Sequence, residues 1–300
     1  MSILFWFKTI IFYSYPLITI IGLITNPLSI FIFTRTKLNK TTFSVYFRFF
    51  LLFQCLDLIL PIYKMFQYNL NIDFSIWSNF LCKLRFYYSR VNLATPAWFL
   101  AIISFEQFMS IVYPTKLLIR KKLKFQLLSS LLIIIMNLLF FTPTLIFCYV
   151  KYEKINETNE TKECVFDGSW FDIVDLIYAI LIPCILMSIF TSITIATVFK
   201  SRQTTTRPPG INKLKSKDIR FAITSISNIF LYLIFNIPYF IFIIIRKNTD
   251  LFEKLNILDL FLHSLFILLI YLSLISSFFI NYIVNSIFRN EIKALKSNLF

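Results

Sequence analysis

Ionisable side chains interrupt long apolar stretches of the sequence, among them Asp57, Arg90, Glu106 and Asp175. A charge is costly inside a lipid bilayer, so each of these positions is a candidate functional site. Their types do not indicate catalysis. The chain has one histidine, His263, and no His–Glu or paired-Asp cluster at the spacing of a metal site. We therefore expect residues that bind or switch, and we expect neither an enzyme nor a cofactor.

The stretch SFEQFMSIVYP, residues 104–114, places polar groups where an apolar run meets a basic loop. It contains Glu106, Gln107 and Phe108. Five basic residues follow it: Lys116, Arg120, Lys121, Lys122 and Lys124. Two interpretations are open, because Glu106 and Gln107 either cap a helix end at the membrane interface or form a functional switch.

The elements that carry these residues are predicted to be membrane helices. Of the 300 residues 58% are hydrophobic, the mean hydropathy is +0.74, and only three residues are glycine. Soluble domains are about 45–50% apolar, so this excess is larger than a soluble core requires. The net charge of +15 lies largely in short loops between apolar runs, which is how membrane orientation is encoded. We therefore expect a lipid bilayer as the partner of this chain, and no nucleic acid.

We predict an all-α membrane protein, a seven-transmembrane helix bundle that forms one domain over residues 1–300. A bilayer core about 30 Å thick is crossed by about 20 apolar residues in a helix. The apolar runs are about 8–33, 43–68, 80–113, 124–149, 171–199, 218–245 and 256–285. The first run has no signal-peptide cleavage site after it, so we expect it to remain as an anchor.

A short amphipathic eighth helix is predicted at residues 286–298. Phe288 and Ile292 share one face of this segment, whereas Arg289 and Lys293 lie elsewhere on it. This pattern is typical of a helix that lies on the membrane surface.

The distribution of basic residues predicts the orientation. The loops at 34–42, 115–125 and 200–220, with the tail from 289, hold eighteen Lys and Arg residues against two acids. The connections on the other side hold eight against ten. Positive residues favour the cytoplasm. We therefore expect a multi-pass protein of the plasma membrane, with its N-terminus outside the cell and its C-terminus in the cytoplasm.

Two glycosylation sequons, at Asn156 and Asn159, lie in the loop at 150–170. Glycosylation of such a sequon requires a surface loop on the secretory side of the membrane, which agrees with the distribution of charge. A third sequon, at Asn39, falls in a predicted cytoplasmic loop and is expected to be unused.

The chain has five cysteines. Cys82 opens the third apolar run and Cys164 lies in the loop with the sequons, so both face the oxidising side. We predict a disulfide between them. Cys55, Cys148 and Cys184 lie within apolar runs and are expected to be small packing residues.

The motif after residue 105 and its distance from Cys82 resemble one receptor family. The chain has Glu106, Gln107 and Phe108 in succession, followed by Ile111 and Pro114, and Gln107 follows Cys82 by 25 residues. Further positions fit the same pattern: Asn26, Asp57, Trp77, Pro183 and Pro238. The sequence is thereby similar to the rhodopsin-like (class A) G-protein-coupled receptors, whose third helix ends in Asp/Glu-Arg-Tyr-x-x-Ile-x-x-Pro.

The chain also departs from the pattern of this family. Gln107 stands where the family has arginine, and Asn236 stands where it has tryptophan. Residues 277–281 (SFFIN) lack the proline and tyrosine of the seventh-helix motif Asn-Pro-x-x-Tyr. The resemblance therefore supports the fold more than the usual activation chemistry.

The resemblance implies that residues 106–108 form an intracellular switch. In the family the arginine pairs with an acid at the inner end of helix six, which here is Asp218, 20 residues before Pro238. Gln107 offers that acid only a neutral hydrogen bond, about half as strong as a charge-assisted one. We expect a weakened inactive state, with raised basal signalling or reduced coupling.

The resemblance also implies a role for Asp57, which binds a sodium ion in the family. Its partners here are expected to be Ser273 and Ser277, whereas Pro96 occupies the position of the third-helix serine. The alternative is a hydrogen-bonded aspartic acid with Asn26 as its partner.

By the same resemblance, Arg90 and Asp175 face the ligand cavity. Either they form an ion pair, since opposite charges attract strongly at low dielectric, or Arg90 binds an anionic and Asp175 a cationic group of the ligand. Tyr87 and His263 are further candidate ligand contacts, with solvation at the surface as the alternative for His263.

These features predict a receptor that couples an extracellular ligand to a heterotrimeric G protein. Residues 151–172 hold six acids against three bases, which favours a cationic ligand or a neuropeptide by electrostatic steering. A chemosensory small molecule is the alternative ligand. A transporter or channel is a further alternative, against which the absence of a visible repeat and the small number of glycines argue.

Overall fold

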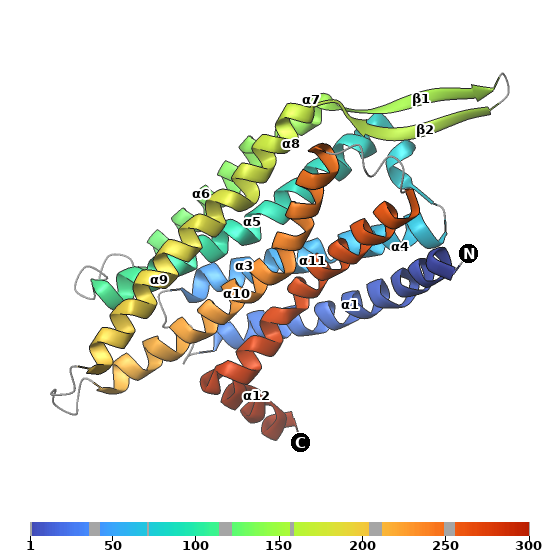
Figure 1. Ribbon diagram of the computed structural model, residues 1–300. Helices are drawn as coiled ribbons and strands as arrows, with labels where there is room; N and C mark the ends of the chain where they lie inside the picture. Colours follow the sequence, from blue (N-terminus) through green and yellow to red (C-terminus); the bar gives the residue numbers. More distant parts are fainter. Residues whose placement is uncertain are drawn as a thin grey trace.

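The computed structural model describes residues 2–35, 43–70, 72–113, 122–156, 159–203, 212–248 and 256–299. Seven helical segments among these residues are long and apolar enough to cross a membrane, and they form an elongated bundle (Figure 1). The segments are Phe12–Thr34, Ser44–Gln67, Asn79–Val112, Leu123–Phe147, Trp170–Thr197, Ile223–Ile245 and Phe261–Val284. The predicted seven-helix fold class is confirmed.

The first three crossings use four helices. They are α1 (Ser2–Thr34), α3 (Ser44–Asp57) with α4 (Ile59–Asn69), and α5 (Asn79–Val112). The second crossing is interrupted at Leu58, because Pro61 has no N–H to donate to the carbonyl of Asp57 four residues earlier. The 3₁₀ turn η1 (Phe74–Ile76) leads into α5, which Ser78 caps by accepting a hydrogen bond from the N–H of Leu81 at 3.2 Å.

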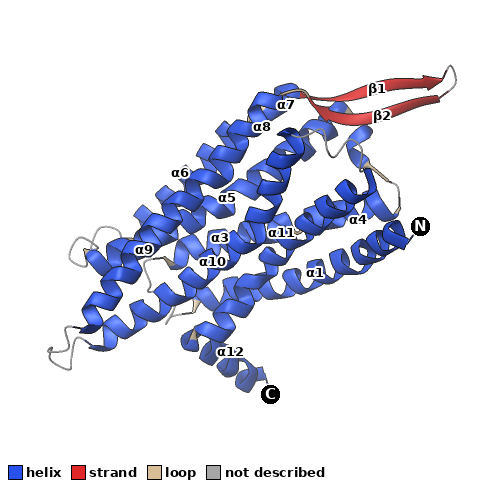
Figure 2. Ribbon diagram, in the orientation of Figure 1, coloured by secondary structure: helices blue, strands red, loops and turns tan. Residues whose placement is uncertain are grey.

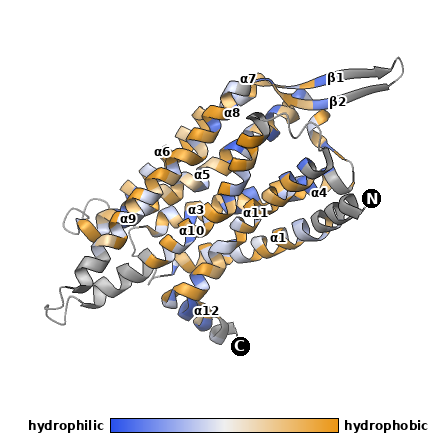
Figure 3. Ribbon diagram, in the orientation of Figure 1, coloured by the Kyte–Doolittle hydropathy of each residue, from blue (hydrophilic) through white to orange (hydrophobic). Residues whose placement is uncertain are grey.

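The remaining crossings follow in chain order. The fourth is α6 (Leu123–Phe140) with the short α7 (Thr144–Phe147), and the fifth is α8 (Ser169–Leu176), the π-helical turn η3 (Ile177–Leu181) and α9 (Ile182–Gln203). The sixth and seventh are α10 (Asn212–Asn248) and α11 (Asn256–Val284). Helices are the expected solution here because a bilayer offers no water to satisfy backbone polar groups, and Figure 3 shows apolar residues along most of their lengths.

The amphipathic eighth helix is confirmed as α12 (Ser286–Leu299). Asn285 caps it, since its Oδ1 accepts hydrogen bonds from the N–H groups of Ile287 and Phe288 at 3.1 and 3.2 Å. Phe288 is fully buried and its ring lies 5.8 Å from those of both Phe33 and Phe278. The apolar face of α12 thus attaches it to the bundle, while Lys293 is exposed.

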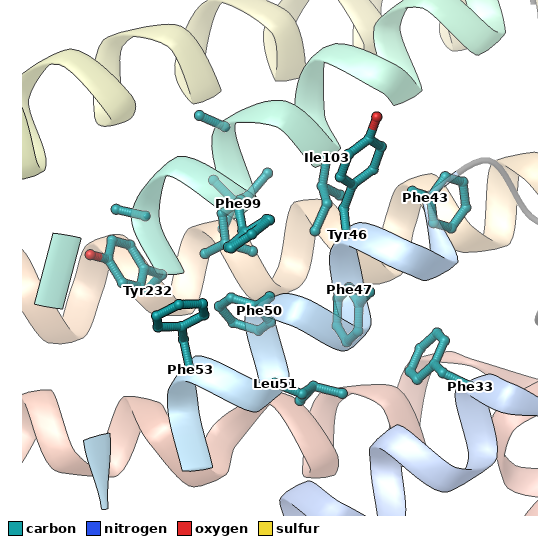
Figure 4. Packing of buried hydrophobic residues seen from close by; sticks show 14 of the residues in the cluster. Phe33, Phe43, Tyr46, Phe47, Phe50, Leu51, Phe53, Phe99, Ile103 and Tyr232 are labelled. Carbon is teal, nitrogen blue, oxygen red and sulfur yellow. The ribbon is translucent and has the colours of Figure 1, made fainter. Parts of the chain in front are cut away.

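The largest hydrophobic core lies where α1, α3 and α5 meet, in the half of the bundle nearer α12 (Figure 4). Phe47 packs against Phe33 at 4.7 Å and against Phe50 at 5.4 Å, measured between ring centroids, with the rings tilted in both pairs. Phe99 of α5 adds a ring 6.0 Å from Phe53. These rings fix α5 against α3, and α5 carries more of the candidate site residues than any other element.

One element differs from the sequence-based expectation. Residues 150–170 were expected as a loop and the fourth run was expected to continue to residue 149, but the helix ends at Phe147. The strands β1 (Cys148–Asn156) and β2 (Asn159–Phe166) form an antiparallel hairpin that projects from one end of the bundle (Figure 2). Residues 150–153 (VKYE) alternate apolar and charged side chains and include residues that favour strands, which suits an extended backbone here.

Candidate ligand and switch sites

The predicted disulfide between Cys82 and Cys164 is confirmed. It joins the first turn of α5 to β2, with the two Cα atoms 5.6 Å apart. Asn79 adds a second attachment, because its Oδ1 accepts a hydrogen bond from the N–H of Val150 at 2.7 Å. The hairpin is therefore held over the end of α5.

Below the hairpin, Arg90 lies between two carboxylates. Its Nη2 is 2.6 Å from Oδ1 of Asp172, and its Nε is 3.7 Å from Oδ2 of Asp175. The Arg90 side chain is only 11% exposed, whereas those of Asp172 and Asp175 are 32% and 20% exposed. Of the two interpretations of Arg90 and Asp175, the ion pair is the one that is present in the structure.

Two aromatic rings complete the surroundings of Arg90. Its guanidinium carbon lies 4.0 Å from the ring centroid of Phe166 on β2 and 5.3 Å from that of Phe171 on α8. Such cation–π contacts contribute about 0.5–2 kcal/mol, more where water is excluded. Arg90 thus connects α5, the hairpin and α8 through both charge and ring contacts.

Asp172 is a partner of Arg90 that the sequence alone does not single out. The sequence places it among the charges of the loop at 150–170 and the residues that follow, whereas it lies in the first turn of α8. Its position three residues before Asp175 was the available signal, because residues three apart share a face of a helix.

The other two candidate ligand contacts lie nearby. Tyr87 packs in the same hydrophobic cluster as Phe166 and Phe171, and its hydroxyl donates to the carbonyl of Leu138 at 2.9 Å. His263 of α11 is half-buried, and its ring lies 5.9 Å from that of Tyr239 and 6.2 Å from that of Phe242 on α10. His263 therefore lies at the contact between α10 and α11 and keeps part of its surface exposed.

Asp57 lies buried near the middle of the bundle, 5% exposed. The alternative that paired it with Asn26 is wrong: Asn26 Nδ2 donates to the carbonyl of Leu274 at 3.1 Å, and the Asp57 Oδ1 and Asn26 Oδ1 atoms have no hydrogen-bond partner among the described residues. Gln54 Nε2 similarly donates to the carbonyl of Ser273 at 3.3 Å. Amide side chains of α1 and α3 thus bind adjacent carbonyls of α11.

The switch stretch is buried at the other end of α5. Glu106 and Gln107 are 2% and 3% exposed, and the helix continues to Val112 beyond them. They therefore do not cap the end of the helix. Gln107 Nε2 has no hydrogen-bond partner among the residues whose side chains the structure describes, and the side chain of Asp218 lies outside that set. Phe108 stacks on Phe190 of α9 at 5.5 Å.

Pro238 lies inside α10, where the family resemblance places the kink proline of the sixth helix. Two residues earlier, Asn236 is 1% exposed, and its Nδ2 donates to the carbonyl of Tyr232 at 2.8 Å. Because a proline leaves the carbonyl four residues earlier without its backbone donor, α10 is locally weakened at Ile234.

A polar cluster that the sequence does not reveal holds the first outer loop, between α4 and α5, in place. Asp73 accepts hydrogen bonds from the hydroxyl of Tyr63, from Ser75 N–H at 2.9 Å and from Gln67 Nε2 at 3.0 Å. Arg85 of α5 donates to Ser75 Oγ at 3.1 Å. Partial burial by itself raises the pKa of the Asp73 carboxyl, but the hydrogen bonds from Ser75 and Tyr63 and the charge of Arg85 outweigh it and hold this pKa below its usual value.

The two sequons lie at the tip of the hairpin. Asn156 and Asn159 end and begin the two strands and pair in register, although their side chains are outside the described part of the chain. The tip extends well beyond the helices (Figure 1).

Seven membrane-crossing helices, an outer hairpin tied by a disulfide to the third crossing, and polar side chains at both ends of that helix define a heptahelical membrane receptor. A family model described as "7 transmembrane receptor (rhodopsin family)" matches residues 25–281, and the chain belongs to this family. A comparison with curated proteins finds no match.

Proposed function

We propose that this receptor transmits the binding of an extracellular peptide to heterotrimeric G proteins, from the plasma membrane, with its N-terminus outside and its C-terminus in the cytoplasm. The observation that carries the ligand assignment is the cluster of Arg90, Asp172 and Asp175 beneath the hairpin. Charged groups of both signs at one place match a ligand that carries charged groups of its own, as peptides do.

The hairpin supports a peptide over a small molecule. A ribbon of only two strands leaves an outer edge of backbone N–H and C=O groups on each strand. An extended peptide recognises such an edge by adding a strand, with its side chains then directed to pockets nearby. The Arg90 cluster, at the base of the ribbon, lies within reach of the end of such a strand.

In this proposal, ligand binding changes the partners of Arg90. An acidic group of the ligand replaces an aspartate at Arg90, or a basic group takes Asp172 or Asp175 away from it. Either exchange loosens the connection between α5 and α8, and helix shifts of this kind are a common way of biasing a two-state bundle. The change reaches the opposite end through α5 itself, which carries Arg90 and Gln107.

At the opposite end, the proposal assigns Glu106, Gln107 and Phe108 to the switch, with Asp218 as the acid that faces Gln107 and Pro238 as the kink that lets α10 move. Gln107 is an amide in place of a cation, so the inactive state is held less firmly than in relatives with arginine.

Asp57 remains a proposed sodium position. Asp57, Ser273 and Ser277 would hold the ion, and all three are buried. The Asp57 Oδ1 without a hydrogen-bond partner suits a cation, and a bound ion would supply counter-charge between α3 and α11. Pro96 leaves α5 without a side-chain oxygen at the remaining position.

The deciding experiment is expression of the receptor in cells that carry reporters for several G-protein classes. Basal activity is recorded first, followed by panels of peptides and of small metabolites. We expect basal activity above that of cells without receptor, and a peptide among the activators. An activator from the small-molecule panel alone would favour the chemosensory alternative, and silence in every reporter would contradict coupling.

A matched pair of variants tests the ligand site. Asp175→Asn is expected to weaken activation by the peptide about tenfold or more, because a buried charged contact is lost. Asp167→Asn, the same chemical change at an exposed acid that follows β2, is the control and is expected to change it little.

A further inference from the structure

A groove on the side of the bundle is unrelated to the ligand and switch sites. It has a volume of about 350 Å³ and lies between α1, α3 and α6. Its lining is apolar apart from one arginine and consists of Ile30, Val45, Arg48, Phe49, Leu52, Leu123 and Leu127. Leu52, Leu123 and Leu127 are 43%, 57% and 44% exposed, so the groove opens toward lipid.

Arg48 places a charge in this groove. It lies in the second turn of α3, and its Nε donates to the carbonyl of Ser44, the first residue of that helix, at 3.3 Å. The guanidinium therefore points back toward the end of the helix, as long basic side chains do when they reach from an apolar surface to the membrane interface.

The end of the groove is basic as well. α6 begins beside Arg48, and Lys122 and Lys124 at its start are exposed on either side of the lining residue Leu123. This end of the bundle is opposite the hairpin (Figure 1). In the proposed orientation it faces the cytoplasm.

We propose that the groove binds one anionic phospholipid of the cytoplasmic leaflet. The lipid phosphate is held by Arg48, its anionic headgroup lies toward Lys122 and Lys124, and an acyl chain follows the wall of Ile30 and Phe49. The planar fork of a guanidinium matches phosphate oxygens in a bidentate way, and the leaflet assignment rests on the proposed orientation.

Charge complementarity selects this occupant. A sterol has no negative group for Arg48. A second copy of the chain packed about a two-fold axis would bring the same surface, and with it a second Arg48, into the interface. A basic mouth and an apolar wall together match a molecule with an anionic head and an apolar tail.

The test uses a tryptophan reporter in the full chain, reconstituted in bilayers. Leu127→Trp adds an indole in the groove to the four native tryptophans, and the quenching by brominated phosphatidylserine or brominated phosphatidylcholine beyond that of the parent reports contact with this indole. We expect phosphatidylserine to be preferred about fivefold, which corresponds to about one basic residue near an anionic headgroup. Ile185→Trp, at an exposed position of α9, is the matched reporter away from the groove and is expected to show a preference below twofold.

Variants in the Leu127→Trp background then assign the selectivity. Arg48→Gln is expected to reduce it below twofold, Arg48→Lys to retain most of it, and Arg289→Gln, an arginine of α12 outside the groove, to leave it unchanged. The double variant Lys122→Gln with Lys124→Gln is an independent test. We expect its preference for phosphatidylserine to fall about twofold. It remains available even where Arg48→Gln fails to fold.

Several results would overturn the lipid site. They are equal quenching by both lipids, a fivefold preference that survives Arg48→Gln, stronger quenching by a brominated sterol, and displacement of phosphatidylserine by soluble glycerophosphoserine. None of these measurements involves signalling, so failure of the lipid site is distinguishable from failure of the proposed receptor function.

Discussion

At the scale of single residues, Arg90 connects more groups than any other candidate ligand contact. It is largely buried and touches two carboxylates and two rings that come from α8 and β2. Because two acids share one cation, the ligand can exchange a partner without leaving Arg90 unpaired. This arrangement accounts for how a structural ion pair can also be a recognition site.

Replacing this cation has a predictable cost. Arg90→Gln removes the charge between Asp172 and Asp175, and we expect the free energy of unfolding to fall by about 1–3 kcal/mol, below the cost of breaking a fully buried pair because the acids are partly exposed. Thermal unfolding of the purified receptor measures the loss. Adding Asp172→Asn to Arg90→Gln is expected to recover part of it, and purely additive losses would contradict the coupling.

The second residue-scale prediction concerns Gln107. Gln107→Arg supplies a cation at a buried position of α5 where a family arginine would face Asp218, so we expect basal signalling to fall severalfold. The control is Gln107→Glu, an acid that cannot pair with Asp218 and is expected not to lower basal signalling below that of the parent. Unchanged basal and ligand-evoked signals in Gln107→Arg would remove the switch assignment, with cell-surface expression measured in parallel.

At the scale of elements, the first outer loop is held between α4 and α5 by the Asp73 cluster. Since the pKa of Asp73 is lowered in the folded protein, its carboxylate stabilises the fold above its unfolded pKa of about 3.9 and ceases to do so as the pH falls through the lower folded value. The loop attachment is therefore expected to be intact throughout the range from pH 5 to pH 8.

Asp73→Asn tests this attachment. At pH 7 we expect a loss of about 1–2 kcal/mol in the free energy of unfolding, because the side-chain donors of Tyr63, Ser75 and Gln67 lose their charged acceptor. The difference between parent and variant is expected to be constant from pH 5 to pH 8 and to shrink below pH 4. A difference that instead grows as the pH falls would contradict the sign of the pKa shift. Asp167→Asn, an exposed acid near the end of the hairpin, is the control.

The hairpin supplies a further element-scale prediction. Cys148, at the start of β1, is fully buried beside Cys82, and burial raises the pKa of its thiol to about 11. Thiolate, the reactive form, is therefore scarce at neutral pH. In the folded receptor at pH 8 we expect a thiol reagent to leave Cys148 unmodified, and in denaturant to modify it fully. Mass spectrometry of the peptides distinguishes the two, and labelling in the folded state at the rate of a small-molecule thiol would show that the hairpin opens.

At the scale of the whole molecule, the crossings were predictable because a bilayer imposes long apolar runs that one sequence reveals directly. The disulfide followed from the same reasoning, since Cys82, at the start of the third apolar run, and Cys164, in the loop with the sequons, were the two cysteines expected on the oxidising side. The hairpin was not predicted, because strand pairing joins residues such as Val150 and Cys164, and no local sequence pattern encodes their contact. Asp172 and the Asp73 cluster were missed for a related reason: both depend on side chains that meet only after the helices have packed.

The orientation of the bundle is the last whole-molecule question. The N-terminus lies at the end that carries the hairpin, and α12 lies at the opposite end (Figure 1), as an odd number of crossings requires. The helix ends on the α12 side are joined by the basic stretches of the sequence, so we expect that end in the cytoplasm. An N-terminal tag is expected to bind an impermeant antibody on intact cells, and a C-terminal tag to do so only after permeabilisation.

The sequons give the same test without tags. If the hairpin is outside, enzymatic deglycosylation lowers the apparent mass of the parent, and the double change Asn156→Gln with Asn159→Gln abolishes that shift, whereas Asn39→Gln leaves it unchanged. A shift that depends on Asn39 instead would invert the bundle and, with it, both the ligand site under the hairpin and the leaflet assigned to the groove. One comparison of masses between the parent and two variants therefore bears on both the ligand site and the lipid groove proposed for this receptor.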